Sequence, residues 1–536
     1  MTRAGRLEGL ALALALLLTS PFHLGWLADP DARLLHNAFQ GGHAWSLQVL
    51  ADSLLSGHWP GVTDRAGFPL DREAAWLGWG SHLLLMLPSR LLGAVAMTNL
   101  ASWLGPALGA PALVLLGRRL LPRVQLQPLL AGAVLYALSP TTLAMAASGQ
   151  IEKAQAWVLP LLLWVLIWAL EGRWTRLLAV LPLWLLGACT SPYAAMFAGL
   201  LVPWLLWLRR PDWRRLLAGS ALALAALLMA RAYLDPLAVG ELGSIFQPAY
   251  TDRHPPLIGH PMPVADLDTL LWGRPDRRCD PPLMHVPYLG LVFLGGALAL
   301  GRWRKEALVP LLLGVFLALG PALAWYEQLL TVSGHQVWLP AALLQLLELP
   351  LARGGHYYRA MVVGHLALGL LLGSARVGWR WLVPLVLLGA LDTGRTVSVY
   401  GVPWPTVELP TRAWSSWAEA PDGAVLHLPT RGRGLIANHP ERLAGHAVHG
   451  RAVSDLPGVN PAPQGDVALA VDCVELERGL CEQDVRSLLI GQGFALVVVD
   501  TPDEDDRGKL IAGLKQALGP PSGSEDGLVW WELGAR

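Results

Sequence analysis

Residues 156–170 read AWVLPLLLWVLIWAL, a run without one charged side chain, and Arg173 and Arg176 follow directly. Apolar runs of about 15–20 residues that end beside basic residues are typical of membrane-crossing helices, because lipid solvates apolar side chains and Arg collects at one membrane face. Similar runs recur through the first three quarters of the 536-residue chain. The fold is therefore expected to be that of a polytopic helical membrane protein.

The composition agrees with this expectation. The chain is 54% hydrophobic and only 15% charged, whereas soluble domains carry about 25% charged residues. Its 40 basic and 40 acidic residues cancel, so there is no global basic field of the kind that attracts nucleic acid. The 25 Trp residues suit membrane interfaces, where indole rings collect. The expected partner is the lipid bilayer, not nucleic acid.

The apolar segments predict about eleven membrane-crossing helices. Residues 1–27 are interpreted as an uncleaved helix because their apolar part, about 20 residues, is longer than the ~7–15 residues of a signal peptide's apolar region. The other predicted helices are residues 93–116, 129–147, 156–170, 177–189, 194–208, 216–234, 286–300, 307–324, 358–375 and 381–397.

The short loops predict the orientation, because Lys and Arg concentrate on the cytoplasmic side. Alternate loops carry Arg clusters, and this alternation favours two short helices over one kinked helix in residues 177–208. The N-terminus is then cytoplasmic, and the long loops at 28–92, 235–285 and 325–357 lie outside. The basic loop residues on the predicted inner side are Arg118, Arg119, Arg123, Arg173, Arg176, Arg209, Arg210, Arg214, Arg215, Arg302, Arg304, Lys305, Arg376 and Arg380.

Two domains are predicted, a transmembrane domain over residues 1–397 and a soluble α/β domain over 398–536 outside the membrane. Within the first domain, residues 28–92 form an extracytoplasmic loop that contains an amphipathic interfacial helix at 32–55. The second domain is expected to have strands at 424–428, 495–499 and 528–533 and helices at 482–491 and 507–518.

Cysteine placement bears on the compartment of the second domain. Cys473 and Cys481 are close enough in sequence to close a short disulfide loop, which an oxidising compartment permits. A zinc site is the alternative interpretation, although two Cys without CxxC or HxxxH spacing are weak support for it.

The first loop is rich in groups capable of chemistry. His36 and His43 are two helical turns apart, but no Cys or carboxylate completes a metal-ligand spacing with them. Neither a metal nor another cofactor is therefore predicted. Between residues 28 and 73, the ionisable residues of the loop are Asp29, Asp31, Arg33, His36, His43, Asp52, His58, Asp64, Arg65, Asp71, Arg72 and Glu73.

Several short motifs together resemble the GT-C superfamily of integral-membrane glycosyltransferases. The resemblance implies a polyprenyl-phosphate sugar donor and a glycan, lipid or protein acceptor at the outer face of a bacterial inner membrane, with a small extracytoplasmic C-terminal domain. The motifs are the acidic pair Asp29 and Asp31, LLSGHWP at 54–60, Thr63 with Asp64, FPL at 68–70, SGQIE at 148–152 before WVLPL, TSPY at 190–193, Tyr358 with Arg359, and residues 423–429 and 450–457.

The resemblance also implies site residues. Sugar transfer needs a base for the acceptor hydroxyl and a cation for the departing phosphate. Asp31 or Asp29 is the expected base and Asp64 a second acidic candidate, while Arg359 is expected to hold the donor phosphate by paired hydrogen bonds. The residues expected to line the cavity are Gln150, Glu152, Tyr193 and His356.

Each assignment has a purely structural alternative. Asp29 and Asp31 suit the start of the helix expected to follow them, and Asp64 suits a turn. Glu152 and Lys153 suit a solvated surface pair, and Arg359 suits an interfacial residue whose charge reaches water. A transporter or envelope assembly factor is the alternative function, although transport predicts ionisable residues within the bundle and repeated halves.

Overall fold

The computed structural model describes most of the chain, and all structural statements refer to these residues: 3–30, 32–35, 40–57, 62–63, 72–73, 79–121, 124–209, 212–239, 267–273, 286–325, 328–346, 357–417, 420–428, 442, 444–445, 449, 451, 484–500 and 504–534. The chain divides into two compact units. The first comprises Met1–Leu24, Leu77–Ser81 and Leu100–Trp404, and the second Gly25–Trp76, His82–Asn99 and Pro405–Arg536.

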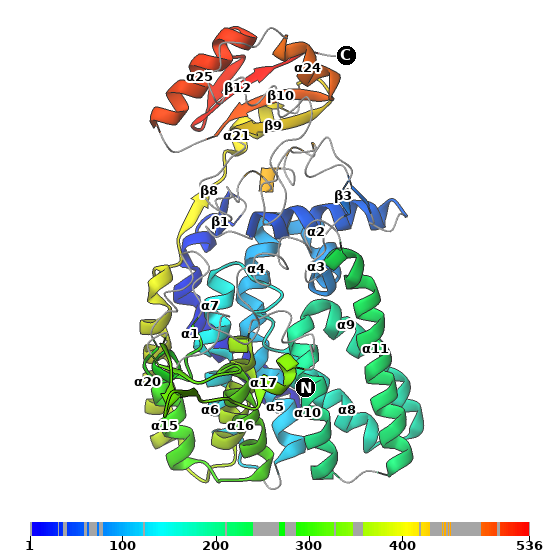
Figure 1. Cartoon of the computed structure of the whole chain (residues 1–536), viewed down its shortest axis with the longest axis vertical. Coiled ribbons are helices and arrows are strands. Elements are labelled where there is room, and N and C mark those ends of the chain that lie inside the picture. Colours follow the sequence, from blue (N-terminus) through cyan, green and yellow to red (C-terminus); the bar gives the residue numbers. More distant parts are fainter. Residues whose placement is uncertain are drawn as a thin grey trace. The chain divides into compact units, whose positions relative to one another are not determined.

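Helices dominate the described residues (Figure 1). Five are long and apolar enough to cross a membrane, namely Gly5–Leu27, Ala94–Leu120, Leu126–Ala147, Pro192–Arg209 and Trp379–Tyr400, and shorter apolar helices cover Val158–Leu170, Trp174–Thr190, Leu291–Leu300 and Tyr357–Gly373. The α-helices are α1 (Arg3–Leu27), α2 (Gln40–Leu55), α3 (Trp79–Leu92), α4 (Ala94–Ala107), α5 (Gly109–Leu120), α6 (Leu126–Ala137), α7 (Pro140–Ala147), α8 (Val158–Leu170), α9 (Val180–Thr190), α10 (Pro192–Arg209), α11 (Trp213–Val239), α14 (Leu267–Trp272), α15 (Leu291–Leu300), α16 (Lys305–Ala318), α17 (Ala341–Leu346), α19 (Met361–Gly373), α20 (Trp379–Val397), α21 (Thr411–Ser416), α24 (Val485–Gly491) and α25 (Glu504–Leu518).

The remaining elements are short. Three 3-10 helices are described, η1 (Trp174–Ala179), η2 (Tyr357–Ala360) and η3 (Ser398–Tyr400). The strands are β1 (Arg33–Leu35), β2 (Val62–Thr63), β3 (Arg72–Glu73), β4 (Ala324–Trp325), β5 (Gln328–Leu329), β6 (Thr331–Val332), β7 (His335–Gln336), β8 (Thr406–Glu408), β9 (Ala424–Leu428), β10 (Phe494–Val499), β11 (Gly523–Glu525) and β12 (Leu528–Glu532).

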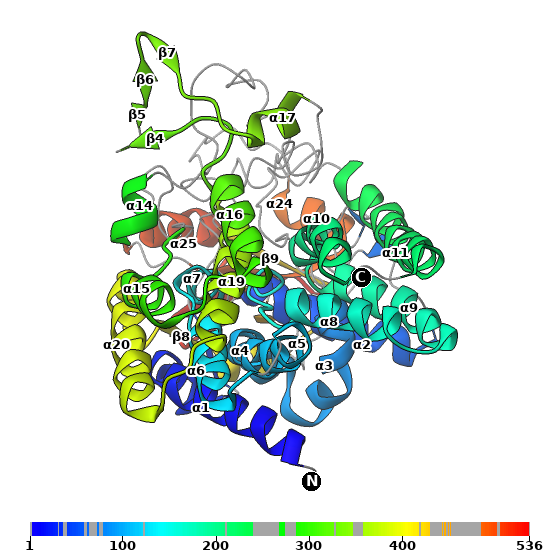
Figure 2. The ribbon, with the colours of Figure 1, turned by 90° about the horizontal axis from the view of Figure 1, so that it is seen from below.

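Helix α19 forms the centre of the helical bundle, between α6 and α16 (Figure 2). Glycines permit this close packing: a Cβ on Gly132 would lie 2.4 Å from the carbonyl oxygen of Gly369, and one on Gly314 would lie 2.5 Å from the amide nitrogen of Gly364. Small residues let helix backbones approach where lipid supplies no hydrophobic driving force between helices. These glycines therefore allow α19 to lie in backbone contact with both α6 and α16.

The prediction of two helices in residues 177–208 is confirmed. Helix α9 ends before Ser191, whose backbone is extended (φ −147°, ψ 89°), and α10 begins at Pro192 and packs on α9. Proline at the first helical position loses no hydrogen bond there, so it favours a new start over continuation.

Two expected helices begin or end at residues clearly different from the predicted ones. The helix predicted at 286–300 begins only at Leu291, after Gly290 with φ +81°. The helix predicted at 307–324 ends at Ala318, and Gly320 with φ +73° follows. A left-handed backbone is not that of a right-handed helix, so α15 begins only after Gly290, and the chain has left the helix when it reaches Gly320. In addition, α3 lies within the predicted first loop, where no such helix was expected.

The prediction of a helix over residues 32–55 was wrong for its first residues. Arg33–Leu35 is strand β1, which pairs antiparallel with β8. Asn99 stabilises this segment, because its Oδ1 accepts from the Leu35 amide at 3.2 Å and its Nδ2 donates to the Arg33 carbonyl at 2.8 Å. Helix α2 begins at Gln40 and is largely buried.

Most strand and helix predictions for the C-terminal residues agree with the structure. Strand β9 has the predicted bounds, while β10, β12, α24 and α25 differ by one to three residues at an end. The sheet has the order β11-β12-β10-β9, with β10 and β9 parallel and the other pairs antiparallel. Apolar side chains of α24 and α25 form one buried cluster with the sheet.

Candidate functional site

The loop between α7 and α8 begins with a well-defined helix end. The amide of Gly149 donates to the carbonyl of Ala146 at 3.0 Å, and the amide of Gln150 donates to that of Met145 at 2.9 Å. This pair of bonds is the Schellman arrangement, which requires a left-handed residue, and Gly149 has φ +76°. The chain therefore turns sharply at Gly149 and carries Gln150 and Glu152 away from the helix axis.

The same loop places two opposite charges in a buried environment. Lys153 Nζ lies 3.1 Å from Glu152 Oε1 and donates to Gln150 Oε1 at 2.7 Å. The side chains of Lys153 and Glu152 are 18% and 7% exposed. The expectation of a solvated surface pair was therefore wrong: neighbouring segments cover this loop, which the local sequence does not reveal.

Arg359 lies in η2, at the start of α19, and is 5% exposed. Its Cζ is 4.1 Å from the centre of the Tyr193 ring and 5.8 Å from that of Tyr358. Its Nε donates to Tyr358 Oη at 3.4 Å, and within the described residues its two terminal nitrogens have no hydrogen-bond acceptor. The guanidinium is thus held by aromatic rings while most of its donors remain available for an anion.

The charges of this cluster, defined as Gln150, Glu152, Lys153, Tyr193 and Arg359, do not balance. Burial and the Arg359 charge lower the pKa of Lys153 to about 8, although Glu152 acts in the opposite direction. Two cations and one carboxylate leave a net positive charge, and Tyr193 in the first turn of α10 adds the positive end of a helix dipole. Such an arrangement stabilises a bound anion, and a phosphate suits the planar guanidinium.

Of the expected acids, Asp29 is the one the structure describes. It is exposed and its Oδ1 accepts from the Ala32 amide at 3.3 Å, in a turn after α1. Because β1 follows instead of a helix, the interpretation that Asp29 caps the next helix was wrong. The remaining expected site residues, Asp31, Asp64, His356, Cys473 and Cys481, lie outside the described residues.

The described residues contain no group of three His, Cys, Asp or Glu side chains that could hold a metal ion. His43 and His82 do meet, with Nδ1 of the first 3.4 Å from Nε2 of the second. His36 and His58 lie outside the described residues.

Two contributions to the site were missed from the sequence. The sequence motifs indicate Lys153 only as a partner of Glu152, and Tyr358 only as a neighbour of Arg359, not as residues of the site. The loop also has an anchor in Tyr136 of α6, whose Oη donates to the Ala156 carbonyl at 2.7 Å. A Tyr inside an apolar helix was the available signal, because a buried hydroxyl requires a partner.

Solved structures with a similar fold are known. No family model and no curated protein sequence matches this chain. Among solved structures, ArnT from Cupriavidus metallidurans bound to undecaprenyl phosphate matches with a TM-score of 0.53 and 15% identity, over 98% of this chain and 97% of that one. The chain has the GT-C fold.

Two further GT-C structures agree. The mycobacterial arabinofuranosyltransferase AftD matches over the whole of this chain, with a TM-score of 0.56 and 16% identity, and this chain spans 42% of its length. The oligosaccharyltransferase AglB from Archaeoglobus fulgidus, in complex with an inhibitory peptide and a dolichol-phosphate, has a TM-score of 0.51 and 12% identity over 94% of this chain and 71% of that one. These likenesses concern the fold.

Proposed function

We propose that this GT-C protein is a membrane glycosyltransferase that transfers a sugar from a polyprenyl-phosphate donor to a glycan, lipid or protein acceptor at the outer membrane face. The observation that carries the proposal is the buried guanidinium of Arg359, whose terminal nitrogens have no acceptor among the described residues and whose charge acts on Lys153. ArnT and AglB, which share the fold, have structures with undecaprenyl phosphate and dolichol-phosphate.

The chemistry assigns a distinct task to each group. The acceptor hydroxyl oxygen attacks the anomeric carbon, and the bond between that carbon and the phosphate oxygen breaks. The departing polyprenyl phosphate gains negative charge, which Arg359 and Lys153 stabilise at fixed positions. The hydroxyl proton passes to a carboxylate, for which Asp31, Asp29 and Asp64 are the candidates.

Glu152 and Gln150 act on the cations rather than on the sugar. Glu152 stabilises the charged form of Lys153, since its charge raises the pKa of that ammonium against burial. Gln150 accepts one ammonium hydrogen and leaves others for the phosphate. Variants of Gln150 and Glu152 are therefore expected to change donor binding, whereas variants of the candidate bases Asp29, Asp31 and Asp64 are expected to change turnover.

A binding experiment tests the phosphate site. The full-length protein in neutral-lipid nanodiscs is titrated with undecaprenyl phosphate, and Arg359→Gln is compared with Arg380→Gln, which removes an exposed Arg of α20. We expect Arg359→Gln to weaken binding about 10- to 100-fold, the effect of losing a charge-assisted hydrogen-bond pair. Equal affinity in the two variants would remove the basis of the proposal.

Turnover tests the transferase assignment. Release of polyprenyl phosphate from a panel of polyprenyl-phosphate sugars is measured for the wild type, Asp29→Asn and Asp31→Asn. We expect one Asn variant to lose turnover while it still binds polyprenyl phosphate. Full activity in both variants would exclude these acids as the base, and donor binding without turnover of any sugar would favour the transporter or assembly-factor function.

A further inference from the structure

A second basic cluster lies at the other end of α19. Residues of three interhelical loops surround a cavity of about 360 Å³. Arg302 and Arg304 come from the loop between α15 and α16, and Arg376 from the loop between α19 and α20. The cavity is lined by Leu121, Val124, Arg302, Arg304, Ser374, Ala375 and Arg376.

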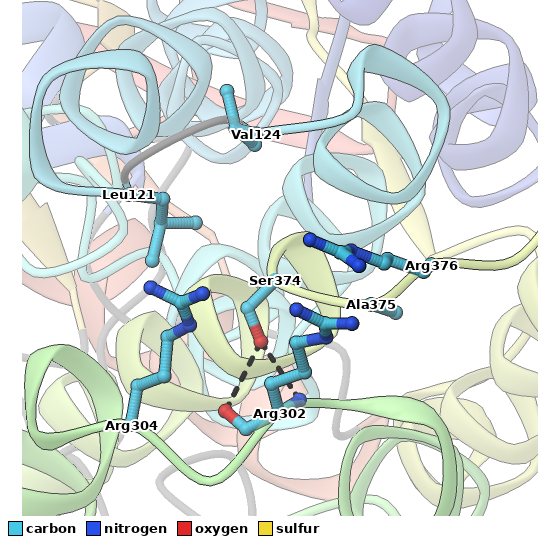
Figure 3. Close-up of a pocket in the computed structure, with 7 residues that line it drawn as sticks. All are labelled: Leu121, Val124, Arg302, Arg304, Ser374, Ala375 and Arg376. Atoms are coloured by element: carbon cyan, nitrogen blue, oxygen red, sulfur yellow. Dashed lines mark hydrogen bonds between the residues drawn. The ribbon is translucent and has the colours of Figure 1, made fainter.

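The loops are held together by a defined polar contact. Ser374 Oγ accepts from the Arg302 amide at 2.8 Å and lies 3.1 Å from the Arg302 carbonyl oxygen. Figure 3 shows this contact below the three guanidinium groups, which are turned toward the same space. The arginines are therefore gathered by the fold and not merely neighbours in sequence.

Other arginines at this end of the bundle have carboxylate partners. Arg118 donates to Glu8 at 2.9 Å, and Arg119 donates to Glu171 at 2.9 Å. Within the part of the chain that the structure describes, Arg302, Arg304 and Arg376 form no ion pair, and Glu306, on the first turn of α16, does not line the cavity. Burial and the charges of Arg376 and Arg304 lower the pKa of Arg302.

We propose that this cavity binds a phosphate group. Three guanidinium groups that line one cavity and have no ion-pair partner among the described residues match a tetrahedral oxyanion. The cavity lies within the size range of ligand sites. Leu121, Val124 and Ala375 provide an apolar wall at the ends of apolar helices. That position suits the headgroup of an anionic phospholipid, and basic pockets between membrane helices bind such headgroups; inorganic phosphate is the other source of the same chemistry.

This site is separate from the proposed donor site. Arg359 precedes α19 and Ser374 follows it, so the length of α19, about 20 Å for its 13 residues, lies between them. The two sites can therefore be tested independently, and failure of one leaves the other intact.

The test compares two phosphate sources. Full-length protein is placed in nanodiscs of phosphatidylcholine alone or with added phosphatidylglycerol, and native mass spectrometry counts the phosphatidylglycerol retained. In a second arm, inorganic phosphate is added to the phosphatidylcholine sample and the shift in Tm is measured. The variants are the triple change Arg302→Gln, Arg304→Gln and Arg376→Gln and the same positions changed to Lys.

The matched control changes Arg173, Arg214 and Arg380 to Gln, three exposed arginines on the same predicted side that do not line the cavity. We expect the cavity Gln variant to lose phosphatidylglycerol affinity about fivefold per arginine, or about 100-fold in total. The Lys variant should retain much of it, and the control should change little.

Selective loss of retained phosphatidylglycerol in the cavity Gln variant supports a lipid headgroup, and a phosphate-dependent Tm shift confined to proteins with cationic cavities supports free phosphate. If the wild type shows neither response, or if the cavity and control Gln variants respond alike, the proposal is overturned. A cavity Gln variant that fails to fold is replaced by the single change Arg376→Gln, whose exposed side chain makes no described contact with the core.

Discussion

The two ends of α19 hold arginines in contrasting environments. At its start, Arg359 is buried against the Tyr193 ring and lies near a charged pair. At its end, Arg302 and Arg304 are half-buried and Arg376 is exposed around an open cavity. At the buried site, each charge interacts strongly with a bound anion, so removing one charge should change the affinity greatly. At the second site, solvent screens each charge, so the affinity should depend on how many charges are present.

Arginine content alone therefore does not indicate a binding site. Arg118 and Arg119 form ion pairs with carboxylates. The arginines at the ends of α19 retain donors instead. If the two environments differ in this way, variants at the two ends of α19 should behave differently.

The largest effect is expected from a change that moves α19 itself. Gly132→Ala places a methyl group 2.4 Å from the Gly369 carbonyl oxygen, so the two backbones must separate. We expect a loss of about 1–3 kcal/mol of stability, seen as a lower Tm in detergent, with weaker binding at both ends. Gly394→Ala in α20 is the matched control, because no atom lies within 4 Å of the added methyl group; an equal loss there would contradict the packing argument.

The next effect concerns Arg359 as a shaped donor. Arg359→Lys retains the charge but removes the planar donor pair and much of the stacking on Tyr193. We expect turnover of the polyprenyl-phosphate donor to fall about tenfold or more, measured as kcat/KM. At the other end of α19, Arg376→Lys should change phosphate binding less than twofold, because exposed charges act by number. If Arg359→Lys and Arg376→Lys caused similar fold-losses, the two sites would not differ in their dependence on the guanidinium shape.

A pH dependence follows from Lys153. Its pKa of about 8 lies below the ordinary value of 10.5, so the folded protein releases this proton first as the pH rises. Donor binding is therefore expected to weaken as the pH passes through about 8, while the free energy of unfolding rises between about 8 and 10.5 because the unfolded chain binds more protons there. Lys153→Arg should abolish the step in a titration of donor affinity against pH, and an unchanged step would assign it to another group.

The smallest effect is expected from Glu152→Gln. Removing this carboxylate removes an interaction that raises the pKa of Lys153, so the pH step in donor affinity should move below 8. Affinity well below the step should change little, because the cations remain. An upward movement of the step would contradict the assigned role of Glu152. Glu306→Gln, in the first turn of α16, serves as the control and should leave the step in place.

Much of the helical fold was predictable because helices are local. The apolar run at 156–170 corresponds to α8, and residues 381–397 to most of α20. The early end of α16 and the late start of α15 depend on Gly320 and Gly290, which were signals present in the sequence. Strand β1 was not predictable in this way, because its partner β8 lies about 370 residues away.

The candidate site was predictable in its residue types but not in its environment. Gln150, Glu152, Tyr193 and Arg359 were all selected from short motifs, yet Glu152 and Lys153 equally suited a solvated pair. Only the burial of the Glu152 and Lys153 side chains in the folded protein distinguishes these alternatives. The cavity around Arg302 was not predicted, since its arginines were explained fully by membrane orientation.

The apolar helices and the basic loops between them can be predicted from the sequence alone, because hydrophobicity and helical hydrogen bonding act over a few neighbouring residues. Which charges have a carboxylate partner among the described residues is known only from the three-dimensional structure. Glu152 and Arg359 are about 200 residues apart, and their electrostatic effect on Lys153 depends on distance and burial. Neither quantity can be obtained from the order of residues.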